Sequence, residues 1–363
     1  MYKSFNIKNF RCFSDLTIKP LEQVNLIAGR NNIGKTALLE ALWMHHGYQN
    51  PQLGIRVDAF RGLNVIREGE VMINIFNEFD QDKDIILIST DEQSHKANLT
   101  ISKKESSTIA IPINIEEYKK KREKKISTNS ELTTGESTGG SRPEIHFEFS
   151  LNKSKKIKSR AYFDKDQLQF EQAKKDFKSL GILLASNNID NPIAIAERFG
   201  NLEVNKSEDD IIKILKIIEP GLEKLIVRFG GGIPTIYGDI GRKKMIPLPL
   251  MGDGIGRLLR ISLAITDATN GIVLIDEIEN GLHHTAIKNI WKSIAQLSRK
   301  YNTQVFATTH SRECIQSAFE AFSEDKKYDF LLHRMEMIKG NIVNVVYDKE
   351  ALEAAIKSNF EIR

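Results

Sequence analysis

Alternating polar and apolar residues dominate the N-terminal part of the chain. Residues 2–10 and 13–20 alternate with a period of two, which predicts the two strands of a hairpin. Residues 23–29 predict a short apolar strand, and residues 35–46 predict a helix whose inner face carries leucines and a tryptophan. Further strands are expected over residues 71–79, 84–90, 97–103 and 144–151.

After about residue 165 the chain is expected to become helical. Apolar residues three and four apart predict helices within residues 191–202 and 207–225. Short apolar runs then predict strands over residues 225–230, 233–239 and 243–250. The remaining expected elements are a helix that starts near residue 252, a strand over 271–277, a helix over 285–301, a strand over 303–310, a hairpin over 330–337 and 341–347, and a helix over 349–360.

Composition places the chain among globular proteins with a large core. It has 363 residues, 40% hydrophobic and 28% charged, enough for roughly two domains. The sequence has no apolar run near the roughly 20 residues of a membrane span and no signal-peptide core, so we expect a cytoplasmic protein with no membrane partner. Cys12 and Cys314 are expected to be buried thiols in a reducing compartment.

Charge is concentrated in one segment. The net charge of +4 is too small to argue for nucleic acid without a local patch. Residues 116–143 are charged and then rich in Ser, Thr and Gly, which predicts a mobile insertion or an extended hairpin loop. The basic runs Lys119–Lys125 and Lys153–Arg160 fit a footprint on a phosphate backbone or a solvated lysine-rich surface, and both interpretations stay open.

The segment GRNNIGKT matches the phosphate-binding pattern G-x-x-x-x-G-K-[ST] and lies between a predicted strand and a predicted helix. Glycines let the backbone wrap so that its N–H groups and the helix N-terminus face phosphates. Lys35 is expected to reach the β- and γ-phosphates, and Thr36 to offer its hydroxyl to Mg²⁺. The expected ATP-binding residues are Gly29, Arg30, Asn31, Asn32, Ile33, Gly34, Lys35, Thr36 and Ala37.

Two further predicted strands end in groups suited to phosphoanhydride hydrolysis. The apolar run Ile272–Ile275 ends in Asp276 and Glu277. Asp276 is suited to hold Mg²⁺ through its water shell, and Glu277 to polarise the attacking water as general base. His310 follows the next predicted strand, where it either donates a hydrogen bond to the γ-phosphate or is an ordinary surface residue.

These motifs carry a resemblance. GRNNIGKT, VLIDE and TTHS resemble the Walker A, Walker B and switch histidine of ABC-type ATPase heads. The N-terminal FNIKNFRCFSDLTI is similar to the opening of RecF, SMC and OLD proteins, and DEIENGLHH and the C-terminal ALEAAIKSNFEIR resemble OLD-like AAA-family ATPases of bacteria. The resemblance covers most of the chain, apart from about residues 100–180.

The resemblance implies an α/β fold, namely a P-loop NTPase with one ABC-type ATPase head over residues 1–363. A β-rich nucleotide-binding lobe would start in residues 1–100 and contain Walker A. Residues 101–180 would form an inserted β and loop segment with the basic loop near 116–143. Residues 181–363 would form a helical signature lobe with Walker B, the D-loop, the switch histidine and a C-terminal helix.

A glycine-rich helix start is also explained by the resemblance. In such heads a signature segment opens a helix before Walker B and faces the nucleotide of the partner subunit. Gly252, Asp253 and Gly254 occupy this position and are expected to contact ATP in trans. Gly252 stands where the signature serine is usual, so backbone groups and Arg257 would take its place. In the alternative interpretation, Asp253 is only a helix N-cap.

Other expected positions are less defined. Arg11 in the first hairpin either reaches the nucleotide, as in related heads, or is a surface arginine. Gln49 and Gln52 follow the first helix too closely to serve as a Q-loop glutamine. The chain has no long heptad run and no segment that resembles a Toprim or HNH nuclease.

The sequence therefore predicts an ATP- and Mg²⁺-dependent ATPase that forms a head-to-tail homodimer. By resemblance, it would regulate a separately encoded, nuclease-like effector in phage defence or DNA surveillance. Two alternatives stay open, a RecF-like repair ATPase that binds DNA directly and an ATP-dependent assembly scaffold with little turnover.

Overall fold

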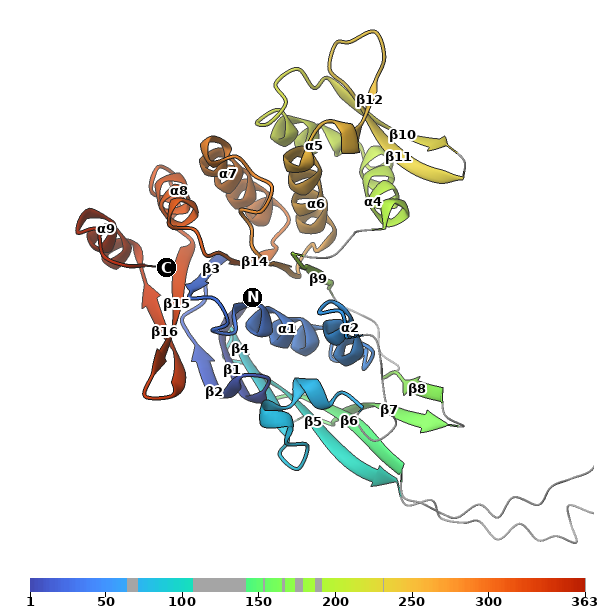
Figure 1. Ribbon diagram of the computed structural model, residues 1–363, viewed down its shortest axis with the longest axis vertical. Helices are drawn as coiled ribbons and strands as arrows, with labels where there is room; N and C mark the ends of the chain where they lie inside the picture. Colours follow the sequence, from blue (N-terminus) through green and yellow to red (C-terminus); the bar gives the residue numbers. More distant parts are fainter. Residues whose placement is uncertain are drawn as a thin grey trace, which may run out of the picture.

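The computed structural model describes residues 1–63, 71–106, 142–152, 154–164, 167–173, 179–186, 191–230 and 232–362. Two large sheets enclose a first pair of helices, and a further row of helices covers the outer face of one sheet (Figure 1). The mixed α/β fold predicted from the sequence is confirmed. Among the described helices, none is long and apolar enough to cross a membrane.

The central sheet has six strands in the order β16-β15-β3-β14-β13-β9. All neighbouring pairs are parallel except β15 with β16, so the carboxyl ends of β3, β14, β13 and β9 meet at one edge. The strands are β3 (Val24–Gly29), β9 (Gly181–Leu184), β13 (Ile272–Ile275), β14 (Gln304–Thr308), β15 (Phe330–Ile338) and β16 (Asn341–Tyr347).

Helices cover both faces of this sheet because its strands are apolar on both sides. Val273 and Ile275 belong to the core of the outer helices, whereas Ile272 and Leu274 belong to the core around α1. The inner helices are α1 (Lys35–His46) and α2 (Leu53–Ala59). The outer helices are α4 (Pro192–Val204), α5 (Glu208–Leu215), α6 (Asp253–Asp267), α7 (His284–Lys300), α8 (Arg312–Ser323) and α9 (Lys349–Lys357).

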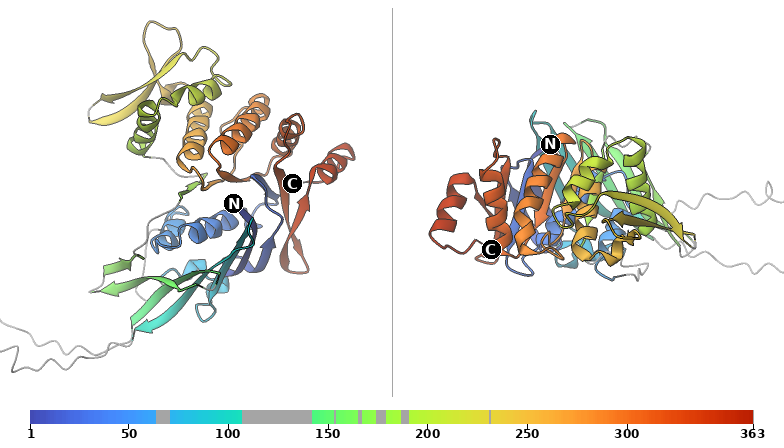
Figure 2. Two further views of the ribbon diagram at one scale, coloured as in Figure 1. Left: turned by 180° about the vertical axis from the view of Figure 1, so that it is seen from behind. Right: turned by 90° about the horizontal axis from the view of Figure 1, so that it is seen from above.

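The second sheet is antiparallel and packs against α1 from the other side (Figures 1 and 2). The expected boundary between residues 100 and 101 falls inside one of its strands, β5. Except for residues 142 and 143, the loop expected near 116–143 lies outside the described residues. The order is β2-β1-β4-β5-β6-β7-β8, with β1 (Tyr2–Phe10), β2 (Phe13–Ile18), β4 (Ile85–Asp91), β5 (Lys96–Ser106), β6 (Arg142–Leu151), β7 (Ile157–Asp164) and β8 (Gln167–Glu171).

A small third sheet lies at the far end of the helical row (Figure 2). It pairs β10 (Lys224–Gly230), β11 (Ile233–Asp239) and β12 (Ile246–Pro247). The last expected strand of this region is short because residues 248–250 turn into a 3-10 helix. The signature lobe predicted as mostly helical thus also carries a sheet.

Two expectations about secondary structure are wrong. Residues 71–79 form two 3-10 turns, η2 (Ile73–Ile75) and η3 (Asn77–Phe79), instead of a strand. Positive φ angles at Met72 and Glu78 break the extended conformation. The chain also does not become helical after residue 165, because β8 and β9 follow. Only four residues form β9, too few for a clear period.

Candidate active site

The phosphate-binding loop connects the end of β3 to the start of α1. Gly29, Asn32 and Gly34 have positive φ angles of 144°, 63° and 100°. A Cβ on Gly29 would lie 2.7 Å from the Met335 carbonyl oxygen, and one on Gly34 would lie 2.5 Å from Cys12 Sγ. Both glycines are therefore required by conformation and by space, and the loop wraps the N-terminus of α1, where anions bind.

Lys35 is folded over this loop. Its Nζ donates hydrogen bonds to the carbonyl oxygens of Gly29 at 2.7 Å and Arg30 at 3.1 Å. Burial lowers the pKa of Lys35, and the nearby carboxylates of Asp276 and Glu277 oppose this shift. Among the other loop residues, Arg30, Asn31 and Asn32 are exposed, whereas Ile33 and Ala37 are buried and present no side chain to a ligand.

The hydroxyl of Thr36 meets the carboxylate of Asp276 although 240 positions separate them. Thr36 Oγ1 lies 3.1 Å from both carboxylate oxygens. Thr308 Oγ1 at the end of β14 lies 2.7 Å from Asp276 Oδ1, and Ser186 Oγ just after β9 lies 3.3 Å from Oδ2. Hydroxyl and carboxylate oxygens are the hard ligands that Mg²⁺ accepts alongside phosphates and waters, so these residues fit that ion.

Sequence reasoning assigned no role to Ser186 or Thr308. A signal existed for both residues, because each follows or ends an apolar strand just as Asp276 does. The missing information was the strand order, which places β9 and β14 on either side of β13.

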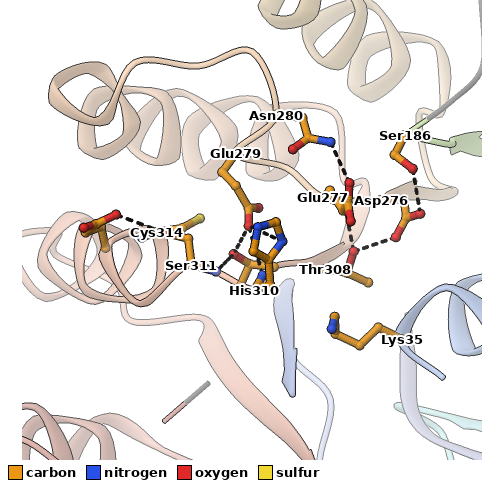
Figure 3. Close-up of polar contacts among 12 residues, drawn as sticks. Lys35, Ser186, Asp276, Glu277, Glu279, Asn280, Thr308, His310, Ser311 and Cys314 are labelled. Carbon is orange, nitrogen blue, oxygen red and sulfur yellow. Dashed lines mark hydrogen bonds and ion pairs between the residues drawn. The ribbon is translucent and has the colours of Figure 1, made fainter. Parts of the chain in front are cut away.

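Glu277 is held by the residues around it. Its φ angle is 49°, and its backbone N–H donates to Thr308 Oγ1 at 2.8 Å. Asn280 Nδ2 donates to Glu277 Oε2 at 2.6 Å. Figure 3 shows Asp276, Glu277 and Thr308 together, with Lys35 on a separate element facing them. The site thus brings together the ammonium group of Lys35, the oxygens of Asp276 and Thr36 that fit a metal, and the oriented carboxylate of Glu277.

His310 lies beside a second acidic residue that the sequence analysis did not single out. Glu279 Oε1 accepts hydrogen bonds from the His310 backbone N–H at 2.9 Å and from Thr309 Oγ1 at 2.7 Å. The same oxygen lies 3.2 Å from His310 Nδ1 (Figure 3). Glu279 therefore fixes the turn that carries the histidine.

The glycine-rich segment opens α6 as expected. Gly252, with φ 103°, is the N-cap, and Asp253 is the first helical residue. The interpretation of Asp253 as the N-cap is therefore wrong. A Cβ on Gly254 would lie 2.9 Å from the carbonyl oxygen of Gly281, whereas a Cβ on Gly256 would meet nothing within 4 Å. Gly254 is needed for packing within the chain, and Gly256 faces open space.

Two arginines that were expected near the nucleotide are bonded within the chain, and for Arg11 the contact with the nucleotide stays a prediction. Arg257 is buried, and its guanidinium donates to the carbonyl oxygens of Asp276 at 2.7 Å and Glu277 at 3.3 Å. The expectation that it reaches a partner's phosphate is wrong, because it braces the end of β13. Arg11 pairs with Glu40 at 2.6 Å and Asp58 at 3.0 Å. Its side chain is only 10% exposed, so the alternative of a surface arginine is wrong.

Most basic residues in the described part of the second basic run form ion pairs with acidic residues. Lys156 and Lys158 lie 2.7 Å and 3.1 Å from the carboxylate of Glu148, and they lower its pKa to about 2. Arg160 pairs with Glu144 and Glu171. The first run, residues 119–125, lies outside the described residues.

Only one of the two cysteines matches the expectation. Cys314 is buried, and burial raises the pKa of its thiol to about 12. Cys12 is exposed, so the prediction of two buried thiols is wrong for this residue. It lies in the turn between β1 and β2, beside Gly34 of the phosphate loop.

Comparisons with known proteins agree with this geometry. The chain is 25% identical over 345 residues to an ATP/GTP phosphatase of Helicobacter pylori, covering 87% of both proteins. A stretch of 74 residues is 37% identical to the DNA replication and repair protein RecF of Idiomarina loihiensis, covering 20% of this chain and 19% of that protein.

Two solved SMC heads are also similar. The SMC head domain from Thermotoga maritima aligns with 14% identity and a TM-score of 0.44, covering 96% of this chain and 99% of its own. The SMC head bound to the C-winged helix domain of ScpA aligns with 13% identity and a TM-score of 0.49, covering 98% and 99%.

The family of the chain follows from a match over most of its length. The expected likeness to RecF-type ATPases is confirmed by the sequence relatives. The model of the AAA ATPase domain family matches residues 1–315. The chain belongs to the AAA ATPase domain family and is an ATPase.

Proposed function

We propose that the chain binds ATP together with Mg²⁺ and hydrolyses the bond to the γ-phosphate. The observation that carries this proposal is the contact of Thr36 Oγ1 with the Asp276 carboxylate at 3.1 Å, beside the cation of Lys35. Bound Mg²⁺ would neutralise charge on the β- and γ-phosphates. Thr36 and Asp276 are the residues that would hold it, Asp276 through water.

Each of the other residues has one task in this proposal. Lys35 exchanges the loop carbonyls of Gly29 and Arg30 for oxygens of the β- and γ-phosphates. Glu277 orients the attacking water and accepts its proton, and its contacts with Asn280 and Thr308 keep it directed into the site. His310 donates a hydrogen bond to the γ-phosphate.

We further propose that two chains form a head-to-tail dimer around ATP. Gly252 and Gly256 leave open space at the start of α6, and glycine allows another backbone or a phosphate to approach closely. The N-terminal end of α6 also favours negative charge. The start of α6 in one chain would therefore cover the γ-phosphate held by the other chain, together with Asp253 and Gly254.

The biological setting that we propose is phage defence or DNA surveillance. Hydrolysis would be slow and would be gated by a separately encoded, nuclease-like effector. This part rests on the resemblance of the segment DEIENGLHH to OLD-like ATPases, because a fold by itself does not define a biological role.

A pair of variants tests the proposed reaction. Lys35→Ala should lose ATP binding, because the phosphates lose their embedded cation. Glu277→Gln should keep ATP binding, lower turnover by about 10²- to 10⁴-fold, and trap an ATP-bound dimer visible by light scattering. Full turnover in Glu277→Gln would refute its role as the general base. If the wild type assembles strongly in the presence of ATP but hydrolyses it only negligibly, the result would instead favour the function of an assembly scaffold.

The second candidate function is a repair ATPase that binds DNA directly. The 37% identity over 74 residues to the DNA replication and repair protein RecF favours it. Fluorescence anisotropy with a duplex oligonucleotide at two salt concentrations tests it, because phosphate contacts lose affinity steeply with salt. Salt-dependent, submicromolar binding by the isolated chain would support this candidate over regulation of an effector.

A further inference from the structure

A second concave site lies at the end of α1 remote from the phosphate loop. The cavity measures about 750 Å³ and is lined by His45 and His46 at the end of α1 and by Ile272 and Gln304, the first residues of β13 and β14. The antiparallel sheet provides its other wall. Lys35 and His45 lie ten residues apart on α1, which is about 15 Å along the helix axis, so the cavity is not part of the ATP site.

Gln49 provides a buried hydrogen-bond acceptor at this cavity. The residue lines the cavity and is only 4% exposed. Its Nε2 donates to the Tyr48 hydroxyl at 3.0 Å, whereas its Oε1 has no hydrogen-bond partner among the described residues. A buried acceptor without a partner is costly, and a ligand with an N–H donor would remove that cost.

The rest of the wall favours a flat and largely neutral molecule. Tyr48 and Phe149 stack with ring centroids 3.6 Å apart. Burial lowers the pKa of both His45 and His46 to about 4, so both rings are neutral at pH 7. Side-chain hydroxyl and amide groups complete this wall, from Ser89, Ser179, Asn270, Asn302 and Gln304. Most of these groups already bond within the chain: Ser179 Oγ contacts His46 Nε2 at 3.2 Å, Asn302 Nδ2 donates to Asn270 Oδ1 at 2.8 Å, and Gln304 bonds to Tyr2. Among the described lining residues, Gln49 Oε1 is the buried acceptor that lacks a partner.

Positive charge at the cavity comes from two lysines on one rim and from the N-terminal amine of Met1 near His46. Lys155 and Lys156 line the cavity and are exposed, with Lys156 also 2.7 Å from Glu148. Asp91, the acidic residue of the wall, is paired with His95 at 3.1 Å. An anionic group therefore fits at the lysine rim, outside the neutral interior.

We propose that this cavity, which we call the α1-end cavity, binds a nucleoside monophosphate. The flat nitrogen heterocycle would lie in the aromatic interior and donate an N–H hydrogen bond to Gln49 Oε1. The phosphate would lie at Lys155 and Lys156. The proposal is independent of the ATP chemistry, since a monophosphate lacks the β- and γ-phosphates that the phosphate loop holds.

Isothermal titration of AMP and of GMP into the full chain tests the proposal. Wild type and Lys35→Ala should bind one of the two saturably, and Gln49→Leu should weaken that binding at least tenfold. Gln52→Leu is the matched control, because this glutamine lies three residues away and does not line the cavity. Gln49→Leu should melt close to wild type, since it removes one hydrogen bond to the Tyr48 hydroxyl together with an unpaired buried acceptor.

A second variant changes only exposed residues, so a loss of binding in it would not come from misfolding of the cavity interior. Replacing both exposed lysines in Lys155→Ala/Lys156→Ala should weaken binding of the monophosphate and leave binding of the corresponding nucleoside unchanged. Three results would each overturn the proposal. They are the absence of saturable binding of both monophosphates, loss of binding in Lys35→Ala, and equal binding by Gln49→Leu and wild type.

Discussion

Glu279 Oε1 lies 3.2 Å from His310 Nδ1 and also accepts the backbone N–H of His310 at 2.9 Å. One carboxylate oxygen therefore sets both the position of the turn and the direction of the imidazole. Glu279 follows β13, and His310 follows β14, its neighbour in the sheet. The contact joins the turn after Asp276 and Glu277 to the histidine that we propose touches the γ-phosphate.

Removing this carboxylate should impair hydrolysis more than binding. We expect Glu279→Ala to lower turnover about tenfold to hundredfold, because small displacements of a group that contacts the transition state are costly. ATP affinity should change less than about threefold, since Lys35 and the phosphate loop are untouched. Glu313→Ala is the control, because this exposed residue accepts only a 3.4 Å hydrogen bond from Ser311. Equal turnover in Glu279→Ala and wild type would contradict the positioning role.

Substitutions at Gly256 test whether the start of α6 contacts the ATP held by a partner chain. Because a Cβ there would meet nothing within 4 Å, Gly256→Ala should stabilise the chain by about 0.5–1 kcal/mol. Gly256→Arg should fold and bind ATP as a monomer, but it should not form the ATP-dependent dimer. Sedimentation with and without ATP measures this. If the arginine variant dimerises normally, the start of α6 does not face a partner.

Gly254 supplies the matching control for that experiment. A Cβ at this position would lie 2.9 Å from the Gly281 carbonyl oxygen, so Gly254→Ala should destabilise the monomer itself. Urea unfolding should therefore show a higher free energy of unfolding than wild type for Gly256→Ala and a lower one for Gly254→Ala. If both free energies change in the same direction, close packing against Gly281 does not explain the glycine at position 254.

Asp276→Asn should uncouple nucleotide binding from Mg²⁺. The carboxylate bonds to Thr36 and Thr308 and is the charged group we assign to the ion. ATP affinity without Mg²⁺ should stay similar, the gain in affinity on adding Mg²⁺ should disappear, and turnover should fall at least about a hundredfold. Ser186→Ala should have a smaller effect, because Ser186 Oγ lies 3.3 Å from this carboxylate. An intact Mg²⁺ dependence in Asp276→Asn would remove Asp276 from the metal site.

Acid should destabilise the fold through buried histidines. Burial lowers the pKa of His333 to about 4, whereas an unfolded histidine titrates near 6.5. As the pH falls below 6.5, the unfolded chain takes up a proton that the folded chain takes up only near pH 4. The free energy of unfolding should thus drop by roughly 2 kcal/mol at pH 5 for this residue.

Urea unfolding of wild type and His333→Gln at pH 7 and pH 5 measures that contribution. The variant should lose less stability on acidification, while His45 and His46, whose pKa values are also lowered to about 4, still contribute in both proteins. Equal losses in the two proteins would show that His333 is not a source of the acid sensitivity.

The local sequence was sufficient to predict the motif residues and the elements that carry them. The conformation of GRNNIGKT depends on glycines within the motif, and the run Ile272–Ile275 is apolar enough to indicate a buried strand before Asp276. The strands β5 and β6 were also predictable, because polar and apolar residues alternate along them, and β4 was predictable from its apolar run Ile85–Ile88. These features depend on neighbours in the chain, so the sequence by itself determined them.

Only the tertiary structure decided which groups meet. Ser186 reaches Asp276 because β9 pairs with β13, and Arg257 turns inward because α6 packs behind the same strand. The need for glycine at position 254 comes from Gly281, and the exposure of Cys12 comes from its turn beside the phosphate loop. Strand order and helix packing are set by burial of apolar surface from distant segments. A local pattern contains no information about which distant segment supplies the partner.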